Sequence, residues 1–216
     1  MNSRGIALLA GLFLLAALSL LALTTATGTI LQRNMATNFQ ENSLALQNAS
    51  IATNYAKAWL NSRPVNERES GCEIDCVLPV GIRNPGELPA RPEFESAAWW
   101  RGNAMAAGYN PETTETAATP DSGVEPAHWI IEEINYETSG DSYGENMAEG
   151  VAYYRIFGRG TGNNTRSVAV IEAIVARPWE GDFRSGLYPP DGRFGAFCQQ
   201  FENRYDCGSL SWRQRR

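Results

Sequence analysis

Four cysteines have the side chains best suited to chemistry in this chain, and they form two local pairs. Cys72 and Cys76 lie four positions apart, and Cys198 and Cys207 lie nine apart. Four thiolates together could hold zinc, but the spacing of the second pair is unlike that of structural zinc sites. Two disulfides are the alternative, with three possible connectivities. We favour Cys72–Cys76 with Cys198–Cys207, because each bond then closes a short loop.

The other polar residues do not form a recognisable catalytic set. His128 is the single histidine, no nucleophile motif accompanies it, and we interpret it as a polar residue at a strand edge. Glu132 and Glu133 should point to opposite faces of a strand, so we expect two solvated carboxylates and not an acid–base pair. The acidic loop of residues 141–146 offers oxygen ligands for calcium but lacks EF-hand spacing. We therefore expect no enzymatic activity, no metal and no cofactor.

The charge balance excludes one class of partner. The chain has 24 acidic and 18 basic residues, which give a net charge of -6. Binding to nucleic acid needs a basic face that neutralises phosphates, and no such excess of positive charge is present. We therefore expect protein partners and no nucleic acid.

The N-terminal residues predict a membrane segment. A short polar leader, residues 1–5, precedes an uncharged run from Ile6 to Leu23. As a helix this run would be about 27 Å long, close to the thickness of a bilayer core. No small-x-small cleavage site follows it, so we expect the run to be retained and any trimming to occur after Gly5. Arg4 precedes it alone, which favours a cytoplasmic start and an exported, disulfide-permissive remainder.

One long helix should follow the leader. No proline interrupts residues 6–62, and the second half carries an apolar stripe. The stripe comprises Leu31, Met35, Phe39, Leu44, Ile51, Tyr55 and Trp59. A small domain cannot bury a helix of this length. We therefore expect its apolar N-terminal half to protrude and its C-terminal half to pack on a sheet.

The rest of the chain divides into three regions. Residues 63–127 are rich in proline and read as irregular, with a short helix around Phe94 to Gly108. Residues 128–177 should form a small antiparallel sheet, and residues 178–216 a region held by a disulfide. The expected strands cover residues 128–135, 151–160 and 167–177. We interpret Gly158-x-Gly160-x-Gly162 as a hairpin turn, because no helix follows it as in a dinucleotide site.

Three segments resemble a known family. Arg4-Gly5-Ile6-Ala7-Leu8 resembles a prepilin peptidase site. The helix carries Leu31-Gln32-Arg33-Asn34-Met35-Ala36-Thr37-Asn38 and then Leu44-Ala45-Leu46-Gln47-Asn48-Ala49. Residues 154–162, followed by the strand that ends at Arg177, form the third segment. Together they are similar to the PilX family of type IV pilus minor pilins, whereas residues 63–127 match no family pattern.

The resemblance implies an α+β, type IV pilin-like fold and a structural role. A prepilin peptidase would cut between Gly5 and Ile6, and the Ile6 amine would be methylated. The implied partners are other minor pilins, the major pilin, a PilY-type tip adhesin and the inner-membrane assembly platform. The protein would be a single-pass protein of the bacterial inner membrane with a periplasmic C-terminus, and would later reach the pilus at the cell surface. Adhesion and twitching motility are the implied functions.

Position 10 departs from the general pilin pattern. Most pilins carry Glu at the fifth mature position, which here is Ala10. That Glu is thought to neutralise the N-terminal amine of a neighbouring subunit inside an apolar filament core, where an unpaired charge is costly. A subunit with Ala10 lacks this charge, so we expect it to prime assembly or cap the pilus tip.

Two alternatives share parts of this pattern. A type II secretion pseudopilin uses the same physics in a different machine, although its tip component usually carries a large inserted domain. A signal-anchored periplasmic binding domain would keep the leader and never polymerise. The state of residues 1–5 in the mature protein separates a pilin from such an anchor.

Overall fold

The computed structural model describes most of the chain. The described residues are 3–64, 67–69, 72, 75–108, 125–138, 150–164, 166–179, 198 and 207–216, with the side chains of 3–8 and 23–27 also left aside. The chain divides into two compact units, Met1–Gln40 and Glu41–Arg216. Helix α1, Ser3–Ser62, contributes to both, which confirms the prediction of a long N-terminal helix.

The N-terminal unit is helical from Ser3 onward. Its described large apolar side chains are exposed, Leu12 at 61% and Phe13 at 70% among them. Within the described residues, no helix combines the length and apolar character needed to cross a membrane.

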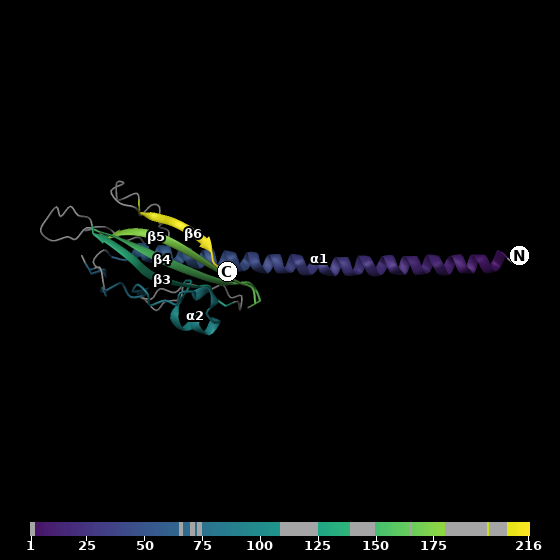
Figure 1. The fold of residues 1–216 in the computed structure, drawn as a ribbon, viewed down its shortest axis with the longest axis horizontal. Coiled ribbons are helices and arrows are strands. Elements are labelled where there is room, and N and C mark those ends of the chain that lie inside the picture. The colour runs from purple at the N-terminus through teal and green to yellow at the C-terminus, as the bar shows by residue number, and fades with distance from the viewer. Residues whose placement is uncertain are drawn as a thin grey trace. The chain divides into compact units, whose positions relative to one another are not determined.

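The second unit is built on a sheet that has six strands within the described residues (Figure 1). Its centre is three long antiparallel strands, β3 (His128–Thr138), β4 (Gly150–Thr161) and β5 (Val168–Trp179). Strand β6 (Gly208–Gln214) extends the sheet beyond β5. The predicted antiparallel pairing of the strands around residues 151–160 and 167–177 is confirmed.

Two short strands extend the sheet, and the parallel pairing of one of them corrects the prediction of a purely antiparallel sheet. Strand β1 (Ile82–Arg83) pairs parallel with β3, and β2 (Met105–Ala106) pairs antiparallel with it. Each has two residues, too few to carry a period in the sequence. The edge strand β6 was also missed, because six of its seven residues are exposed and no buried–exposed alternation marks it.

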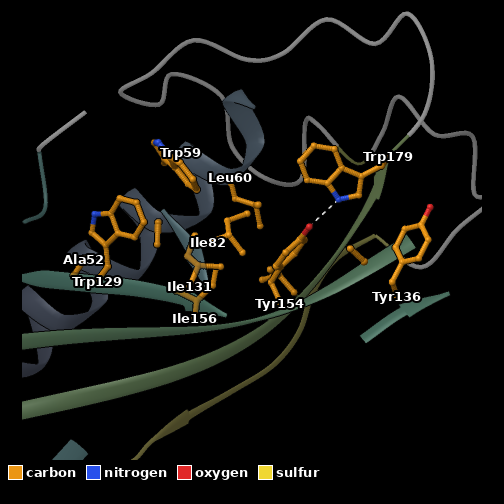
Figure 2. Close-up of a cluster of buried hydrophobic side chains, with 13 residues drawn as sticks. Ala52, Trp59, Leu60, Ile82, Trp129, Ile131, Tyr136, Tyr154, Ile156 and Trp179 are labelled. Atoms are coloured by element: carbon orange, nitrogen blue, oxygen red, sulfur yellow. Dashed lines mark hydrogen bonds between the residues drawn. The ribbon is translucent and has the colours of Figure 1, made fainter. Parts of the chain in front are cut away.

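Helices cover the two faces of this sheet. The C-terminal part of α1 packs on one face, with Ala52, Trp59 and Leu60 meeting Ile131 and Ile156 in the main core (Figure 2). On the other face lie the 3₁₀ helix η2 (Pro92–Phe94) and helix α2 (Ala97–Asn103). There a second cluster gathers apolar side chains from both layers, namely Leu88, Trp100, Ile130, Phe157 and Val170.

Helix α2 is the short helix expected between Phe94 and Gly108, and its first turn is capped. The Ser96 hydroxyl accepts the Trp99 backbone N–H at 3.1 Å, which satisfies a free donor at the helix start. The capped turn presents Trp100 to the second core, where its indole N–H donates to the Pro92 carbonyl at 3.1 Å.

All four cysteines are in disulfides. Cys72 bonds to Cys76 and Cys198 to Cys207, with Cα atoms 5.6 and 5.4 Å apart. This is the pairing that the two short loops favour, and it leaves no free thiolate for zinc. The second bond immediately precedes β6 at Gly208, so a disulfide holds the start of the last strand.

Candidate functional site

The distinctive feature of this chain is the close contact between α1 and strand β4. Gly158, Gly160 and Gly162 follow one another at intervals of two, so they share the face of the strand that meets α1. A Cβ at Gly158 would meet the Ala49 carbonyl, and one at Gly160 would meet the Ala49 amide. Helix and strand therefore touch backbone to backbone. This corrects the turn interpretation, because Gly158 and Gly160 lie inside β4.

Small side chains on α1 make this approach possible. Ala45, Ala49, Ala52 and Ala56 are almost fully buried, and their spacing of four, three and four keeps them on one helical face. The predicted apolar stripe is thus only partly the docking face. Trp59 belongs to the core, but Ile51 is 41% exposed.

Tyr55, another predicted stripe position, packs against the main core. Three further stripe positions lie outside the sheet unit: Leu31, Met35 and Phe39 belong to the N-terminal unit and are 57%, 60% and 78% exposed. Bulky side chains would hold the helix away from a strand of glycines, so close packing selects alanine over the larger residues that amphipathicity usually marks.

Polar contacts fix the register where the C-terminal unit begins. Glu41 is buried, and its carboxylate accepts the Asn164 backbone N–H at 3.0 Å and the Asn163 amide at 3.3 Å. Two helical turns further along α1, the Asn48 side chain donates to the Thr161 carbonyl at 2.7 Å. The helix is thus hydrogen-bonded to the hairpin between β4 and β5, which prevents it from sliding along the glycines.

A buried arginine holds the other end of α1. The Arg177 guanidinium donates to the carbonyls of Leu60 at 2.6 Å and Arg63 at 2.5 Å. It also lies 3.8 Å from the centre of the Trp179 ring. Free carbonyls and the negative end of the helix dipole favour a cation here. Burial lowers the pKa of Arg177, but a guanidinium stays protonated at neutral pH.

Behind the helix end, a buried polar network joins the sheet to the first disulfide loop. Arg68 donates to both Glu133 oxygens at 2.9 and 2.7 Å, and to the Cys72 carbonyl at 3.0 Å. The Tyr154 hydroxyl donates to Glu133 at 3.0 Å and accepts the Trp179 indole N–H at 2.9 Å (Figure 2). Burial raises the pKa of the Tyr154 phenol, and Glu133 adds to the shift.

The adjacent carboxylate, Glu132, serves the opposite face of the sheet. It pairs with Arg155 and accepts the backbone N–H groups of Gly86 at 2.9 Å and Leu88 at 3.4 Å. The prediction that Glu132 and Glu133 point apart is confirmed. The prediction that they are solvated is wrong, because both are buried, at 0% and 3% exposure.

His128 is buried, contrary to the interpretation as a strand-edge residue. It begins β3, pairs with Ala106 on one side and Arg159 on the other, and is 4% exposed. Burial lowers the pKa of His128. The nearby Arg159 lowers it further, whereas Glu125 opposes the shift.

The described part of the chain holds no cluster of potential metal ligands. There, no three His, Cys, Asp or Glu side chains gather as metal ligands would. The candidate calcium loop, residues 141–146, lies outside the described residues. Gly5 and Ile6 lie in the first turns of α1, and Ala10 is helical and exposed.

A family comparison is consistent with this helix-on-sheet geometry. The model of the type IV pilus assembly protein PilX, C-terminal region, matches residues 34–177, about two thirds of the chain. The chain belongs to the PilX family. The match runs from Asn34 in α1 to Arg177, the residue that holds the end of that helix. No curated protein and no solved structure was found to match the chain.

Membership of the PilX family sets the broad role. PilX proteins are pilus assembly proteins with a structural role. The chain is therefore a protein of the minor pilin class, related to type IV pilus assembly. Its partners belong to the other components of the pilus. Its location is the cell envelope or the pilus.

Sequence reasoning missed most of the residues that hold this fold together. Arg68, Glu41 and Asn48 bond to groups at least 60 positions away, and no local pattern marks such partners. The glycines gave the one usable signal. Glycines at alternate positions, two within β4 and one just beyond its end, indicate close approach of another backbone.

Proposed function

We propose that this PilX-family chain is a minor pilin that primes assembly of a type IV pilus or caps its tip. The observation that carries the proposal is Ala10, where the general pilin pattern has Glu. Because a charge-neutralising Glu serves a subunit placed ahead, its absence suits a subunit with none ahead of it.

The N-terminal processing completes this proposal. Arg4 stays on the cytoplasmic side, a prepilin peptidase removes residues 1–5, and the Ile6 amine is methylated. The uncharged run Ile6–Leu23 then moves from lipid into a bundle of similar helices. Lipid and helix bundle are both apolar, so small residues such as Gly11 and Ala17 supply the close packing that favours the bundle.

The sheet unit would serve as the display surface. Its partners would be other minor pilins, the major pilin beneath and a PilY-type tip adhesin, which would support adhesion and twitching motility. The contacts of α1 with β4 and with Arg177 support this role, because they hold the C-terminal part of the helix rigidly on the sheet.

A mass measurement tests the processing step. We expect protein purified from piliated cells to lack residues 1–5 and to carry one methyl group on Ile6. Gly5→Glu should keep the leader and abolish assembly. An intact N-terminus in wild-type protein would instead favour a signal-anchored domain, and loss of the whole apolar run would exclude a pilin.

The tip position is tested by restoring the charge. Ala10→Glu should let the protein enter the pilus shaft in larger numbers, as seen by immunogold labelling of sheared pili. Ala10→Gln is the matched control, since it has similar size without the carboxylate and should stay at the tip. Wild-type copies spaced evenly along shafts would contradict the proposal.

A further inference from the structure

Strand β6 is the last strand of the sheet among the described residues. It pairs with β5 on one side, and among the described residues no strand pairs with its other side. An edge strand presents free N–H and C=O groups to any chain that can lie beside it.

The backbone contacts identify which groups of β6 face away from β5. The Arg215 N–H donates to the Val170 carbonyl at 2.8 Å, and the register continues with Arg213 opposite Glu172. Backbone groups of alternate residues in an antiparallel strand point to opposite sides. The N–H and C=O of Trp212 and Gln214 therefore point away from β5.

Edge strands are often protected from further pairing by a bulge, a proline or a lysine. In β6 such a feature is present only in the first half. An extra residue, Leu210, creates a bulge where the register shifts between Ile174 and Val175. From Ser211 to Gln214 the pairing is regular and contains no proline or lysine. This half also exposes Trp212, a large apolar side chain that is 54% exposed.

The two faces of the open half differ in chemistry. Trp212 lies opposite Ala173, a residue buried on the α1 side, so the indole is on that side. Arg213 lies on the other side, where its guanidinium binds Glu172 at 2.8 Å and remains 60% exposed. A strand added here would place alternate side chains beside an indole and beside a cation.

The charge near this edge is positive although the chain is negative. Among the described residues, Arg213 and Arg215 pair with two carboxylates, Glu93 and Glu172, and Arg216 donates to the Glu93 backbone carbonyl. The whole chain carries -6. An acidic segment therefore meets cations at this edge of a chain whose net charge would otherwise repel it.

We propose that the Ser211–Gln214 edge of β6 binds an extended segment of another protein in which apolar and acidic residues alternate, by adding it to the sheet as a further strand. An apolar side chain covers Trp212, and an acidic one meets Arg213. Main-chain hydrogen bonds to Trp212 and Gln214 supply the affinity, as in other cases of strand addition.

A second copy of this chain fits the edge less well. Strand β6 contains no acidic residue, so a second β6 would have no carboxylate to place against Arg213. The inference goes beyond the proposed function, because it holds whether or not the chain occupies a pilus tip.

Synthetic peptides test the proposal on the full-length protein in detergent. The probe is a fluorescently labelled hexapeptide of alternating Val and Glu, followed by fluorescence anisotropy. We expect saturable binding, about tenfold tighter than for the Val–Lys peptide. Two further Val–Glu peptides carry N-methyl groups on every second amide, one on the odd set and the other on the even set. Only one of the two should lose binding, since only one set of amides faces β6.

Variants of β6 complete the test. Gln214→Pro removes an N–H that points away from β5, so the sheet should persist while peptide affinity falls about tenfold. Gln214→Ala is the matched control and should bind as wild type. Trp212→Ala provides a second probe of the same edge.

Three results would overturn the proposal: no saturable binding of the Val–Glu peptide, equal affinity for the Val–Lys peptide, or unchanged affinity in both Gln214→Pro and Trp212→Ala. Self-association in analytical ultracentrifugation that Gln214→Pro abolishes and the peptide does not displace would assign the edge to a second copy instead.

Discussion

Gly160 in β4 lies against the peptide group that joins Asn48 to Ala49 in α1. No side chain of β4 separates strand from helix at this point. The contact sits between the Glu41 and Asn48 hydrogen bonds at one end and the Arg177 cap at the other. The position of the helix on the sheet therefore depends on the absence of a Cβ here, as it does at Gly158.

Adding that Cβ should loosen the C-terminal unit. Gly160→Ala forces α1 away from β4, because the new Cβ would collide with backbone atoms of Ala45, Asn48 and Ala49. Backbone atoms cannot rotate aside as a side chain can. We expect the free energy of unfolding to fall by about 1–3 kcal/mol, the usual range for an overpacked core. Denaturant titration of the full-length protein in detergent, followed by tryptophan fluorescence, measures the change.

Gly102→Ala is the control for that experiment. Gly102 lies in α2 with no atom within 4 Å of its added Cβ, so the methyl group meets no obstacle. Alanine favours helix over glycine by about 1 kcal/mol, so stability should stay the same or rise. Equal losses in the two variants would show that the contact between α1 and β4 is not the cause.

The elements of this fold could be predicted, but their contacts could not. The absence of proline up to Pro64 predicted α1, and strand-like runs of residues predicted β3 to β5. The prediction of the docking face of α1 was only partly right, because this face uses Ala45 and Ala49. Alanine contributes much less to an amphipathic pattern than a large residue such as Phe39. Amphipathicity identifies large buried side chains, whereas this interface is selected for small ones.

The buried pair of Arg68 and Glu133 gives a second prediction. Arg68→Met leaves the Glu133 carboxylate buried without its cation, which should lower stability by about 3–5 kcal/mol. Arg68→Lys should also lose stability, because lysine cannot make the two-pronged contact. Thermal unfolding monitored by near-ultraviolet circular dichroism reports both losses.

A pair with one solvent-exposed partner supplies the comparison. Arg101 binds Glu125 at 2.9 Å, but its side chain is 58% exposed. Water screens such a pair, so Arg101→Met should cost less than about 1 kcal/mol. If Arg68→Met were as mild as Arg101→Met, the buried network would not be a stabilising anchor for the Cys72 loop.

These buried charges show where sequence reasoning ends. Alternation placed Glu132 and Glu133 on opposite faces, because that follows from strand geometry alone. Their burial depends on Arg155 and Arg68, and Arg68 lies 65 positions from Glu133. A carboxylate without visible partners reads as solvated, and only the three-dimensional fold supplies those partners.

The lowered pKa of His128 predicts a loss of stability in mild acid. Burial disfavours the charged imidazole in the folded state, with Arg159 and Arg101 adding to the effect and Glu125 and the Pro126 backbone opposing it. The unfolded chain therefore binds the proton first, near pH 6.5. Stability should be complete above about pH 6.5 and fall as pH decreases toward the lower folded pKa.

His128→Gln isolates this effect, since the chain has one histidine. The variant should lose the decline in melting temperature below about pH 6.5 that we expect for the wild type. The same slope in both proteins would attribute the decline to carboxylates.

The Cys198–Cys207 disulfide should control the order of β6. Cys207 directly precedes Gly208, so Cys198→Ser frees the start of the strand while leaving α1 and the leader unchanged. The loop-entropy model gives a loss of about 2–3 kcal/mol for a loop of this size. Hydrogen exchange of residues 208–214 should accelerate, and membrane insertion should be unaffected.

The double variant Cys72→Ser/Cys76→Ser removes the other disulfide, whose loop contacts Arg68 and not β6. Protection of β6 should persist there, and equal acceleration in both variants would mean that neither bond acts locally.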